Sequence, residues 1–307
     1  MKILVTGGAG FIGKHLVNYL LKNNYNVTLF DNFSNSNITS VQKFLDKGIT
    51  VIDGDIIKLN DIIKASEDQE IIIHLAAKIS VEESIKNPSE TFLTNVEGTK
   101  NVILACEKHQ IKKLIIASSA AVYGECVPNF KLTEESNLNP ISPYGESKKR
   151  MEEIVQNMLI KSKVNYIILR FFNIYGIGQS SEYAGVITKF MESIKNKKPL
   201  EIFGDGIQTR DFISIHNVID SIHNAITNNK NGIFNIASGK IITIKKLAKL
   251  MISLSGKELD IRYLSSKKGD IKYSEVDISL AKKELKYNPT IELKDGIKEL
   301  MNELNHF

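Results

Sequence analysis

Residues 2–13, KILVTGGAGFIG, decide the fold that this sequence predicts. A short β-branched run ends at Thr6 and leads directly into a turn carrying Gly7, Gly10 and Gly13, after which an apolar helical pattern begins. In such a unit the first glycine permits the tight turn, the second lets the backbone approach a pyrophosphate, and the third lets helix and strand pack closely. The helix then directs free N–H groups and the positive end of its dipole at the phosphates.

A carboxylate stands where a dinucleotide would need one. Asp31 follows Gly13 by 18 residues, at the end of the next predicted strand, and is placed to accept a hydrogen bond from a ribose 2′-hydroxyl. This placement favours NAD over NADP. Glycines that serve only a turn are the alternative, which the strand, turn and helix context disfavours. Asp55, after the third predicted strand, is a weaker candidate for the adenine end, with a simple loop carboxylate as the alternative.

Short strands alternate with amphipathic helices through the first 170 residues, which is typical of an α/β fold with a doubly wound parallel sheet. The regularity weakens in two later stretches, which indicates a smaller mixed α/β lobe built from two pieces. We therefore predict a Rossmann-type dinucleotide-binding domain over residues 1–172 and 209–238, and a substrate-binding lobe over residues 173–208 and 239–307. The predicted strands of the sheet are residues 2–6, 26–30, 49–53, 71–75, 113–118, 165–170 and 232–238.

Composition excludes several other classes of protein. The 307 residues are 42% hydrophobic and 24% charged, as in a globular protein with a proper core. The net charge of +5 comes from lysine clusters interleaved with acids, so we expect no nucleic-acid partner. The longest nearly apolar stretch, residues 114–122, is far short of the ~20 residues that span a bilayer, so we expect no membrane helix. Only Cys106 and Cys126 occur, which favours a reducing cytoplasm, and no metal-binding motif is present.

Tyr144 and Lys148 lie four residues apart in SPYGESKKRMEE, with Pro143 placed to start a helix. Both side chains then share one helix face, where an ammonium group would lower the phenol pKa and create a general base. The same spacing also occurs on solvated helices by chance. Ser119 lies at the end of a predicted parallel strand, the edge where sites form in such sheets. Its position supports a catalytic role for Tyr144 and Lys148.

Five motifs together carry a resemblance: TGGAGFIG, SSAAVYG, the YxxxK of Tyr144 and Lys148, RFFN at 170–173 and GDGIQTRDF at 204–212. In this order they resemble the extended short-chain dehydrogenase/reductase family, and within it the UDP-glucose 4-epimerase group. The resemblance implies that NAD is retained while the hexose of a UDP-sugar is inverted at C4 through a transient 4-keto sugar. It implies Tyr144 as the base, Lys148 as the group that tunes it and holds the nicotinamide ribose, and Ser119 as a hydrogen-bond partner of the sugar hydroxyl.

The resemblance also assigns binding residues and a homodimer. The implied cofactor-binding residues are Gly7, Gly10, Phe11, Ile12, Gly13, Asp31, Asn32, Asn35, Ser36, Asp55, Ile56, Ala76, Ala77, Asn95, Tyr144 and Lys148. The implied substrate-binding residues are Ser119, Tyr144, Asn173, Phe203, Arg210, Lys267, Asp270 and Ser274. Apolar stripes on the helices predicted over residues 89–108 and 143–161 belong either to the core or to the dimer face.

Departures from the family pattern bear on the reaction. Ala120 and Ala121 replace the acid/base pair of the sugar 4,6-dehydratases, which disfavours water elimination. Lys267 replaces an arginine and loses the bidentate fork for phosphate, and Phe171 replaces a tyrosine. Ser274 stands where a bulky tyrosine would restrict the pocket, so we expect N-acetylhexosamines to be accepted, unless this serine merely faces solvent. Rival functions are uronate epimerisation or decarboxylation, and a non-catalytic NAD-binding sensor.

Three histidines are expected to have structural roles. His74 lies at a strand end, and His216 and His223 lie seven residues apart on one helical pattern. No carboxylate or cysteine completes a metal-binding set with them. We expect no metal site.

Overall fold

A computed structural model describes residues 1–127, 130–179, 185–266 and 271–305. The chain divides into two compact units, each with its own core. The first unit comprises Met1–Val122, Ser142–Arg170 and Ser221–Phe234, and the second comprises Tyr123–Ile141, Phe171–Asp220 and Asn235–Phe307.

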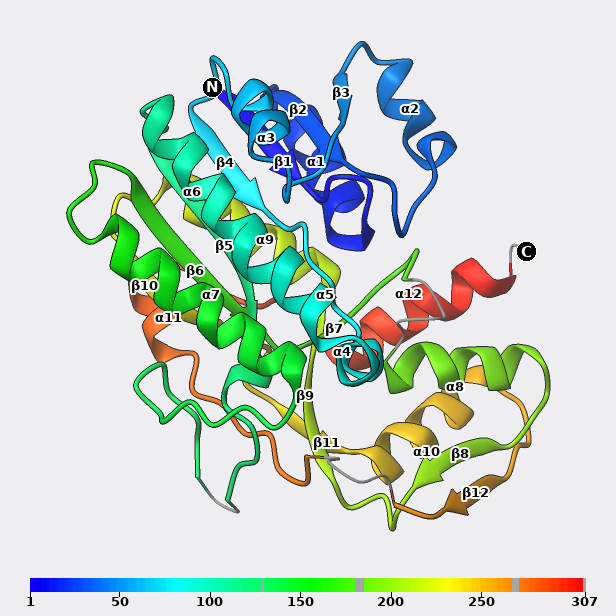
Figure 1. Ribbon diagram of the computed structural model, residues 1–307. Helices are drawn as coiled ribbons and strands as arrows, with labels where there is room; N and C mark the ends of the chain where they lie inside the picture. The colour runs from blue at the N-terminus through cyan, green and yellow to red at the C-terminus, as the bar shows by residue number, and fades with distance from the viewer. Residues whose placement is uncertain (128–129, 180–184, 267–270, 306–307) are drawn as a thin grey trace. The chain divides into compact units, whose positions relative to one another are not determined.

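A seven-stranded sheet forms the centre of the first unit, in the order β10-β6-β5-β4-β1-β2-β3 (Figure 1). The strand pairs β3–β2, β2–β1, β1–β4 and β4–β5 are parallel. The order reverses between β1 and β4, and the crevice outside such a reversal is where ligands bind in doubly wound sheets. The strands are β1 (Lys2–Thr6), β2 (Asn26–Asp31), β3 (Thr50–Asp53), β4 (Ile71–His74), β5 (Lys113–Ser119), β6 (Asn165–Phe171) and β10 (Gly232–Ile236).

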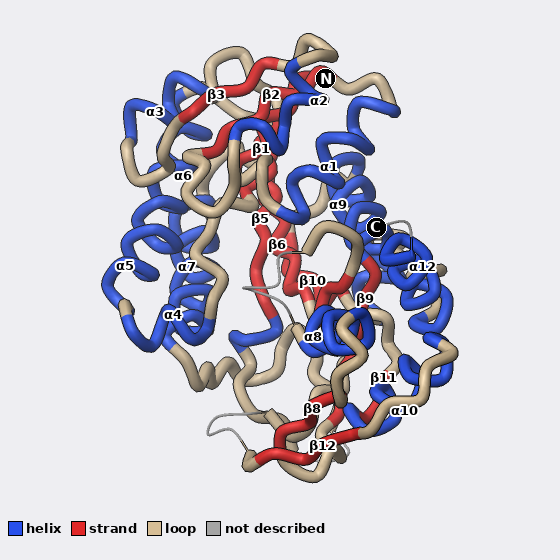
Figure 2. The backbone as a smooth tube through the Cα atoms, turned by 90° about the vertical axis from the view of Figure 1, so that its right-hand side faces the viewer, coloured by secondary structure: helices blue, strands red, loops and turns tan. Residues whose placement is uncertain are grey.

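Helices cover both faces of this sheet, as its fully buried strands require. Helices α3, α6 and α7 lie on one face, and α1 and α9 lie on the other (Figure 2). The ring of His223 on α9 packs edge-on against Tyr19 of α1, with 5.2 Å between ring centroids. The helical segments are α1 (Phe11–Lys22), η1 (Ile38–Val41), α2 (Gln42–Leu45), α3 (Leu59–Ala65), α4 (Val81–Lys86), α5 (Pro88–Phe92), η2 (Leu93–Glu97), α6 (Gly98–Lys108), η3 (Ala120–Val122), α7 (Pro143–Leu159) and α9 (Ile215–Thr227).

The core under α7 resolves the alternative left open for its apolar stripe. Met151 and Val155 are 1% and 0% exposed and belong to the main core cluster of the first unit. Ile154 and Met158 are partly buried and pack against the same cluster. The stripe is therefore internal.

The second unit has two small sheets and a separate core. A three-stranded sheet has the order β11-β9-β7, and strands β12 and β8 form a parallel pair. Helix α8 buries Ile187, Phe190, Met191 and Ile194, which follow the spacing of a one-sided amphipathic helix. The elements are β7 (Asn173–Tyr175), α8 (Val186–Lys195), β8 (Leu200–Phe203), β9 (Thr209–Ser214), β11 (Ile241–Thr243), α10 (Ile244–Ser255), β12 (Ile261–Leu264), α11 (Ser279–Glu284) and α12 (Leu293–Asn305).

The boundaries of the units differ from the predicted domains in four stretches. The dinucleotide-binding domain was predicted to include residues 123–141, 171–172, 209–220 and 235–238, which belong to the second unit. Strand β9 pairs with β7 and β11 rather than with the large sheet. Leu132 forms a bridge to Val276, which ties the loop after η3 to the same unit.

Candidate active site

The glycine-rich turn brings the ends of β1 and β4 into direct contact. Gly7 has a φ of +69°, and a Cβ there would lie 2.6 Å from the backbone nitrogen of Ala76. A Cβ on Gly13 would lie 2.3 Å from the carbonyl oxygen of Gly7. Glycine is therefore required at both positions, for backbone conformation at the first and for close packing at both. Ala76 and Ala77, which follow β4, are thus brought beside the turn at the reversal of strand order.

Helix α1 begins at this turn with its first N–H groups uncommitted to a capping side chain. Gly10 is its N-cap and makes no side-chain cap hydrogen bond, and the first turn contains no acidic residue. Phe11 and Ile12 supply the first helical N–H groups and are partly buried. A helix start of this kind fits the pyrophosphate of a dinucleotide, as the sequence predicts.

Asp31 ties the glycine-rich turn to the loop after β2. One carboxylate oxygen accepts a hydrogen bond from the N–H of Ala9 at 2.9 Å, and the other accepts from the N–H of Phe33 at 2.8 Å. Phe33 has a φ of +54°, so the loop turns sharply at this contact. Burial raises the pKa of Asp31 above its usual value, while these two backbone hydrogen bonds oppose the shift. Each oxygen keeps a further lone pair for a ribose hydroxyl.

Two of the residues predicted for the adenosine side, Asn32 and Asp55, are hydrogen-bonded to each other. The side-chain amide of Asn32 donates to Asp55 at 3.0 Å, and Asp55 also accepts from the N–H of Ile57 at 3.1 Å. Ile56 is 3% exposed. The Ser36 hydroxyl oxygen is buried and has no hydrogen-bond partner among the described residues. A buried hydroxyl without a partner fits a polar ligand group such as a ribose or phosphate oxygen. Asn35 is exposed on the same loop.

Asn95 is predicted to line the cofactor, and its amide is fully engaged by protein groups. It accepts from the N–H of Lys78 at 2.8 Å and donates to the Lys78 carbonyl at 2.9 Å and to the Ser147 hydroxyl at 2.9 Å. Asn95 lies in the π-helical segment η2 and is 0% exposed. It therefore fixes the loop after β4 against α7. We propose that its contribution to cofactor binding is this positioning.

Ser119, Tyr144 and Lys148 meet at the carboxyl end of β5. Ser119 is the last residue of that strand, and Tyr144 is the second residue of α7. Ser142 caps α7 by accepting from the N–H of Gly145 at 3.1 Å, with Pro143 in the first turn. The phenol of Tyr144 is hydrogen-bonded to Ser119. Two hydroxyls that share a hydrogen bond at this edge can both contact one hydroxyl of a bound sugar.

The ammonium group of Lys148 points at the end of β5. Its Nζ donates to the carbonyl of Ala117 at 2.8 Å and lies 3.9 Å from the sulfur of Met151. Lys148 is 4% exposed. Burial lowers its pKa to about 8, and the nearby Glu152 carboxylate opposes that shift. An ammonium has three donors, so one is available for a ribose hydroxyl of a bound dinucleotide.

The predicted lowering of the Tyr144 pKa by Lys148 is wrong for the protein alone. Burial raises the pKa of the phenol, and the hydrogen bond with Ser119 is the effect that opposes it. The shared helix face is present, but the Lys148 Nζ hydrogen-bonds to the Ala117 carbonyl. The Lys148 charge is therefore not among the effects that shift the Tyr144 pKa in the protein alone.

Three of the predicted substrate-binding residues, Asn173, Phe203 and Arg210, lie in the second unit. The Asn173 side-chain amide donates to the Asp211 carbonyl at 2.8 Å. Arg210 lies in β9, and its Nη1 donates to the Thr209 carbonyl at 2.8 Å. Phe203 ends β8, and its carbonyl accepts from the Gln208 amide at 2.7 Å. Lys267 and Asp270 lie outside the described residues.

Ser274 does not face solvent. It is 8% exposed, and its N–H donates to the Thr209 hydroxyl at 3.4 Å. The alternative of an exposed serine is therefore wrong. Ser274 is held beside β9, the strand that also carries Arg210.

The histidines have structural partners. The ring nitrogens of His74 lie 2.7 Å from the Thr6 hydroxyl and 3.0 Å from the Thr99 hydroxyl. Burial lowers its pKa to about 3, so it is neutral at pH 7. His216 contacts Glu299, and His223 contacts Tyr25.

Two searches of the described ranges bear on ligands and membranes. In residues 1–127, 130–179, 185–266 and 271–305, no group of three or more His, Cys, Asp or Glu side chains could hold a metal ion. Within the same ranges, no helix combines the length and the apolar character that a bilayer crossing requires.

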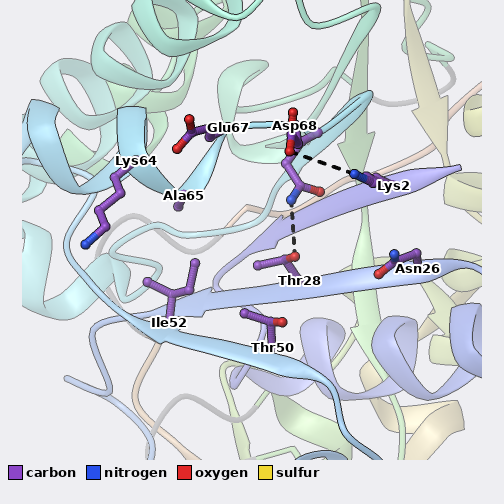
Figure 3. Close-up of a pocket in the computed structure, with 10 residues that line it drawn as sticks. Lys2, Asn26, Thr28, Thr50, Ile52, Lys64, Ala65, Glu67 and Asp68 are labelled. Atoms are coloured by element: carbon purple, nitrogen blue, oxygen red, sulfur yellow. Dashed lines mark hydrogen bonds and ion pairs between the residues drawn. The ribbon is translucent and has the colours of Figure 1, made fainter.

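A hollow on the surface of the first unit lies at the other edge of the sheet (Figure 3). The hollow is lined by Lys2, Asn26 and Thr50, each of which starts a strand. The Lys2 Nζ lies 4.0 Å from the Oδ2 of Asp68, which also lines the hollow. The candidate catalytic residues follow the carboxyl ends of the strands. This hollow is therefore separate from them.

Sequence and fold match one family along most of the chain. The NAD-dependent epimerase/dehydratase family matches residues 3–237. A Methanocaldococcus jannaschii protein with a provisional UDP-glucose 4-epimerase assignment is 39% identical over 307 residues, which cover 98% of this chain and 97% of that protein. The chain belongs to the NAD-dependent epimerase/dehydratase family. Its membership confirms the predicted resemblance and NAD as the cofactor.

Two solved structures of this family share the whole fold. A UDP-N-acetylglucosamine 4-epimerase from Methanobrevibacter ruminantium is 33% identical with a TM-score of 0.94, covering 100% of this chain and 99% of the other. A UDP-glucuronic acid 4-epimerase from Bacillus cereus, solved with UDP-glucuronic acid and NAD, is 32% identical with a TM-score of 0.92 over 100% and 99% of the two chains. The predicted α/β fold is confirmed. The relatives are UDP-sugar 4-epimerases that differ in the sugar.

Replacing Asp31 with Asn should weaken NAD binding by about tenfold to a hundredfold, because hydrogen bonds to a charged group contribute roughly 1.5–3 kcal/mol. The preference for NAD over NADP should shrink, since the negative charge facing a 2′-phosphate is gone. Calorimetric titration of the cofactor-free protein measures both affinities. Asp46→Asn, on the exposed end of α2, is the matched control and should bind NAD as the wild type does. Unchanged NAD affinity in Asp31→Asn would contradict the ribose assignment.

Proposed function

We propose that this protein is a UDP-hexose 4-epimerase that interconverts UDP-glucose and UDP-galactose. The observation that carries the proposal is the hydrogen-bonded pair of Ser119 and Tyr144 at the carboxyl end of β5, with the Lys148 ammonium one helical turn further on. Asp31 and the glycine-rich turn, which fit a dinucleotide, lie in the same unit.

The proposed chemistry requires one base and one fixed hydroxyl contact. Tyr144 takes the proton of the sugar 4-hydroxyl and returns it at the end of the reaction. Ser119 holds that hydroxyl through its own hydrogen bond. Lys148 holds a ribose hydroxyl of the cofactor, and its charge favours the phenolate against the burial that raises the Tyr144 pKa in the protein alone. Bound NAD supplies a reversible hydride acceptor, so no net oxidation occurs.

Residues after Ser119 disfavour the dehydratase reaction of other family members. Ala120 and Ala121 form the start of η3 and have no group that could donate or accept a proton. Elimination of water from the sugar needs an acid and a base in addition to Tyr144. We therefore propose epimerisation rather than elimination.

The sugar is proposed from Ser274. A small side chain beside β9 leaves more room than a tyrosine would, so we propose that UDP-N-acetylglucosamine and UDP-N-acetylgalactosamine are also substrates. The 33% identical UDP-N-acetylglucosamine 4-epimerase supports this proposal. The second candidate function is epimerisation of a UDP-uronate, which the similarity to the Bacillus cereus enzyme favours. Arg210, and Lys267 with Asp270, are proposed to bind the nucleotide diphosphate in either case.

We also propose a cytoplasmic homodimer. Cys106 and Cys126 are both free and buried, as expected in a reducing compartment. Four exposed apolar side chains occur between residues 79 and 93, in and around α4 and η2: Ile79, Val81, Ile85 and Leu93. An apolar surface of this kind is typical of an interface.

Incubation with a panel of UDP-sugars and no added NAD tests the function. We expect interconversion of UDP-glucose with UDP-galactose and of the two N-acetylated counterparts, because the hydride returns to the sugar within one catalytic cycle. Tyr144→Phe should abolish turnover, a loss of at least about 100-fold for removal of a general base, while NAD stays bound. Product analysis by chromatography and the absorbance of released NAD measure both. Turnover of UDP-glucuronic acid alone would favour the second candidate, and no turnover of any UDP-sugar would contradict the proposal.

Light scattering after size-exclusion chromatography tests the homodimer. We expect the wild type to elute with twice the mass of one chain. Ile85→Glu, at a side chain that is 63% exposed, should shift it to one chain, because a charge at an apolar interface is costly to desolvate. Ile160→Glu, at a side chain 76% exposed at the end of α7, is the control and should remain dimeric. A monomeric wild type would contradict the proposal.

A further inference from the structure

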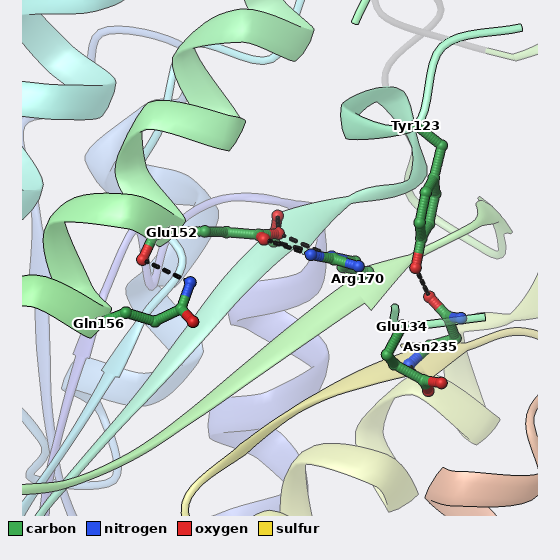
Figure 4. A network of polar contacts seen from close by, with 7 residues as sticks. Tyr123, Glu134, Glu152, Gln156, Arg170 and Asn235 are labelled. Atoms are coloured by element: carbon green, nitrogen blue, oxygen red, sulfur yellow. Dashed lines mark hydrogen bonds and ion pairs between the residues drawn. The ribbon is translucent and has the colours of Figure 1, made fainter. Parts of the chain in front are cut away.

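A buried ion pair lies directly behind the candidate catalytic residues. Glu152 and Arg170 are 1% and 2% exposed, and the guanidinium binds the carboxylate through Nε at 3.0 Å and Nη2 at 2.7 Å (Figure 4). The Ser118 hydroxyl donates to the same carboxylate at 2.5 Å. The carboxylate thus accepts hydrogen bonds from Ser118 on β5 and from Arg170 on β6. Glu152 itself lies on α7, which comes between these two strands in the sequence. Removing two charges from water is expensive, so such a pair calls for a role beyond stability.

Glu152 and its partner Ser118 each lie close in sequence to a candidate catalytic residue. Glu152 follows Lys148 by four residues on α7, so the two share a helix face. Ser118 precedes Ser119 directly at the end of β5. Ala117, one residue earlier, supplies the carbonyl that accepts from Lys148 at 2.8 Å. One strand end is therefore held to α7 by two hydrogen bonds, one from Ser118 and one from Lys148.

Glu152 is also the charge that favours the ammonium form of Lys148. Burial lowers the pKa of Lys148 to about 8, and the Glu152 carboxylate is the effect that opposes it. Four other groups near Lys148 are neutral at pH 7. His74 on β4 has its pKa lowered to about 3, the pKa of Tyr144 is raised by burial, and Ala117 and Met151 are uncharged.

We propose that Glu152 is a positioning residue for the catalytic set: anchored by Arg170, it keeps the buried Lys148 ammonium charged and fixes the strand end that carries Ser119. This inference rests on the proposed function, because it assigns a purpose to the charge on Lys148. Neither Glu152 nor Arg170 contacts a substrate in this account. They act through Lys148 and Ser119.

Two variants separate this role from a purely structural one. Glu152→Gln removes the negative charge and leaves the positive charge of the buried Arg170 in place. The double variant Glu152→Met with Arg170→Met removes both charges and fills the space with apolar groups, a replacement that buried ion pairs often tolerate. Glu153→Gln, on the same helix and paired with Arg150 at 2.8 Å near the surface, is the matched control.

The readout is the titration of Lys148 itself, followed by NMR of protein labelled with ¹³C-lysine, with its signal assigned from Lys148→Met. We expect the Lys148 pKa to fall by about one unit in Glu152→Gln, by less in the double variant, and not at all in Glu153→Gln. The alkaline limb of the kcat profile should move to lower pH in the same order.

The NMR titration needs no substrate, so it gives a result even if no UDP-sugar is turned over. An absence of turnover would count against the proposed function and not against this inference. A Lys148 that titrates at the wild-type pH in both folded variants would overturn the inference. Failure of both variants to fold would overturn it as well, because the pair would then serve the fold.

Discussion

A buried ammonium group constrains the catalytic part of this molecule. Lys148 is almost excluded from water, and a desolvated charge is tolerated in a protein only when hydrogen bonds and an opposite charge surround it. The Ala117 carbonyl supplies the hydrogen bond, and the Glu152 carboxylate supplies the charge. Arg170 in turn satisfies Glu152. The contacts that run from Lys148 through Glu152 to Arg170 thus determine how α7 packs on β5. They therefore also determine where Ser119 and Tyr144 meet.

The parallel sheet explains why these residues can gather although they are far apart in the chain. All strands that pair in parallel direct their carboxyl ends to one edge, and the strand order reverses between β1 and β4. At that point the backbone at Gly7 lies so close to Ala76 that a side chain on Gly7 would overlap it. The cofactor-binding turn and the strand end bearing Ser119 therefore belong to one edge. The second unit supplies a separate group of polar residues around β9.

Local signals in the sequence were sufficient for the large sheet. Each predicted strand of that sheet lies within two residues of an observed one, because buried parallel strands are short continuous apolar runs with glycine or polar ends. The five short strands of the second unit were not predicted. Each has only three to six residues and pairs with a strand that is distant in the sequence, so no local periodicity marks it. Residues 123–141 fall in a different unit from the predicted one for the same reason, since a bridge between Leu132 and Val276 is not visible in sequence.

Spacing and strand order predicted that Tyr144, Lys148 and Ser119 lie together, but they did not predict the electrostatics of these residues. A spacing of four between Tyr144 and Lys148 gives a shared helix face without giving the direction of the lysine side chain or the burial of the phenol. Glu152 offered the same signal, four residues beyond Lys148 on a helix with an apolar face, and its partner Arg170 lies in a motif already recognised. Their pairing depends on how α7 packs on β5 and β6, and only the tertiary structure shows this packing.

In the proposed reaction, one sugar carbon is oxidised and then reduced at this site without exchange with water. Incubation of UDP-glucose carrying deuterium at C4 with the purified protein, followed by mass spectrometry and NMR of the epimerised product, tests this step. We expect the deuterium to remain at C4 of the product. Replacement of this deuterium by solvent hydrogen during inversion would contradict it.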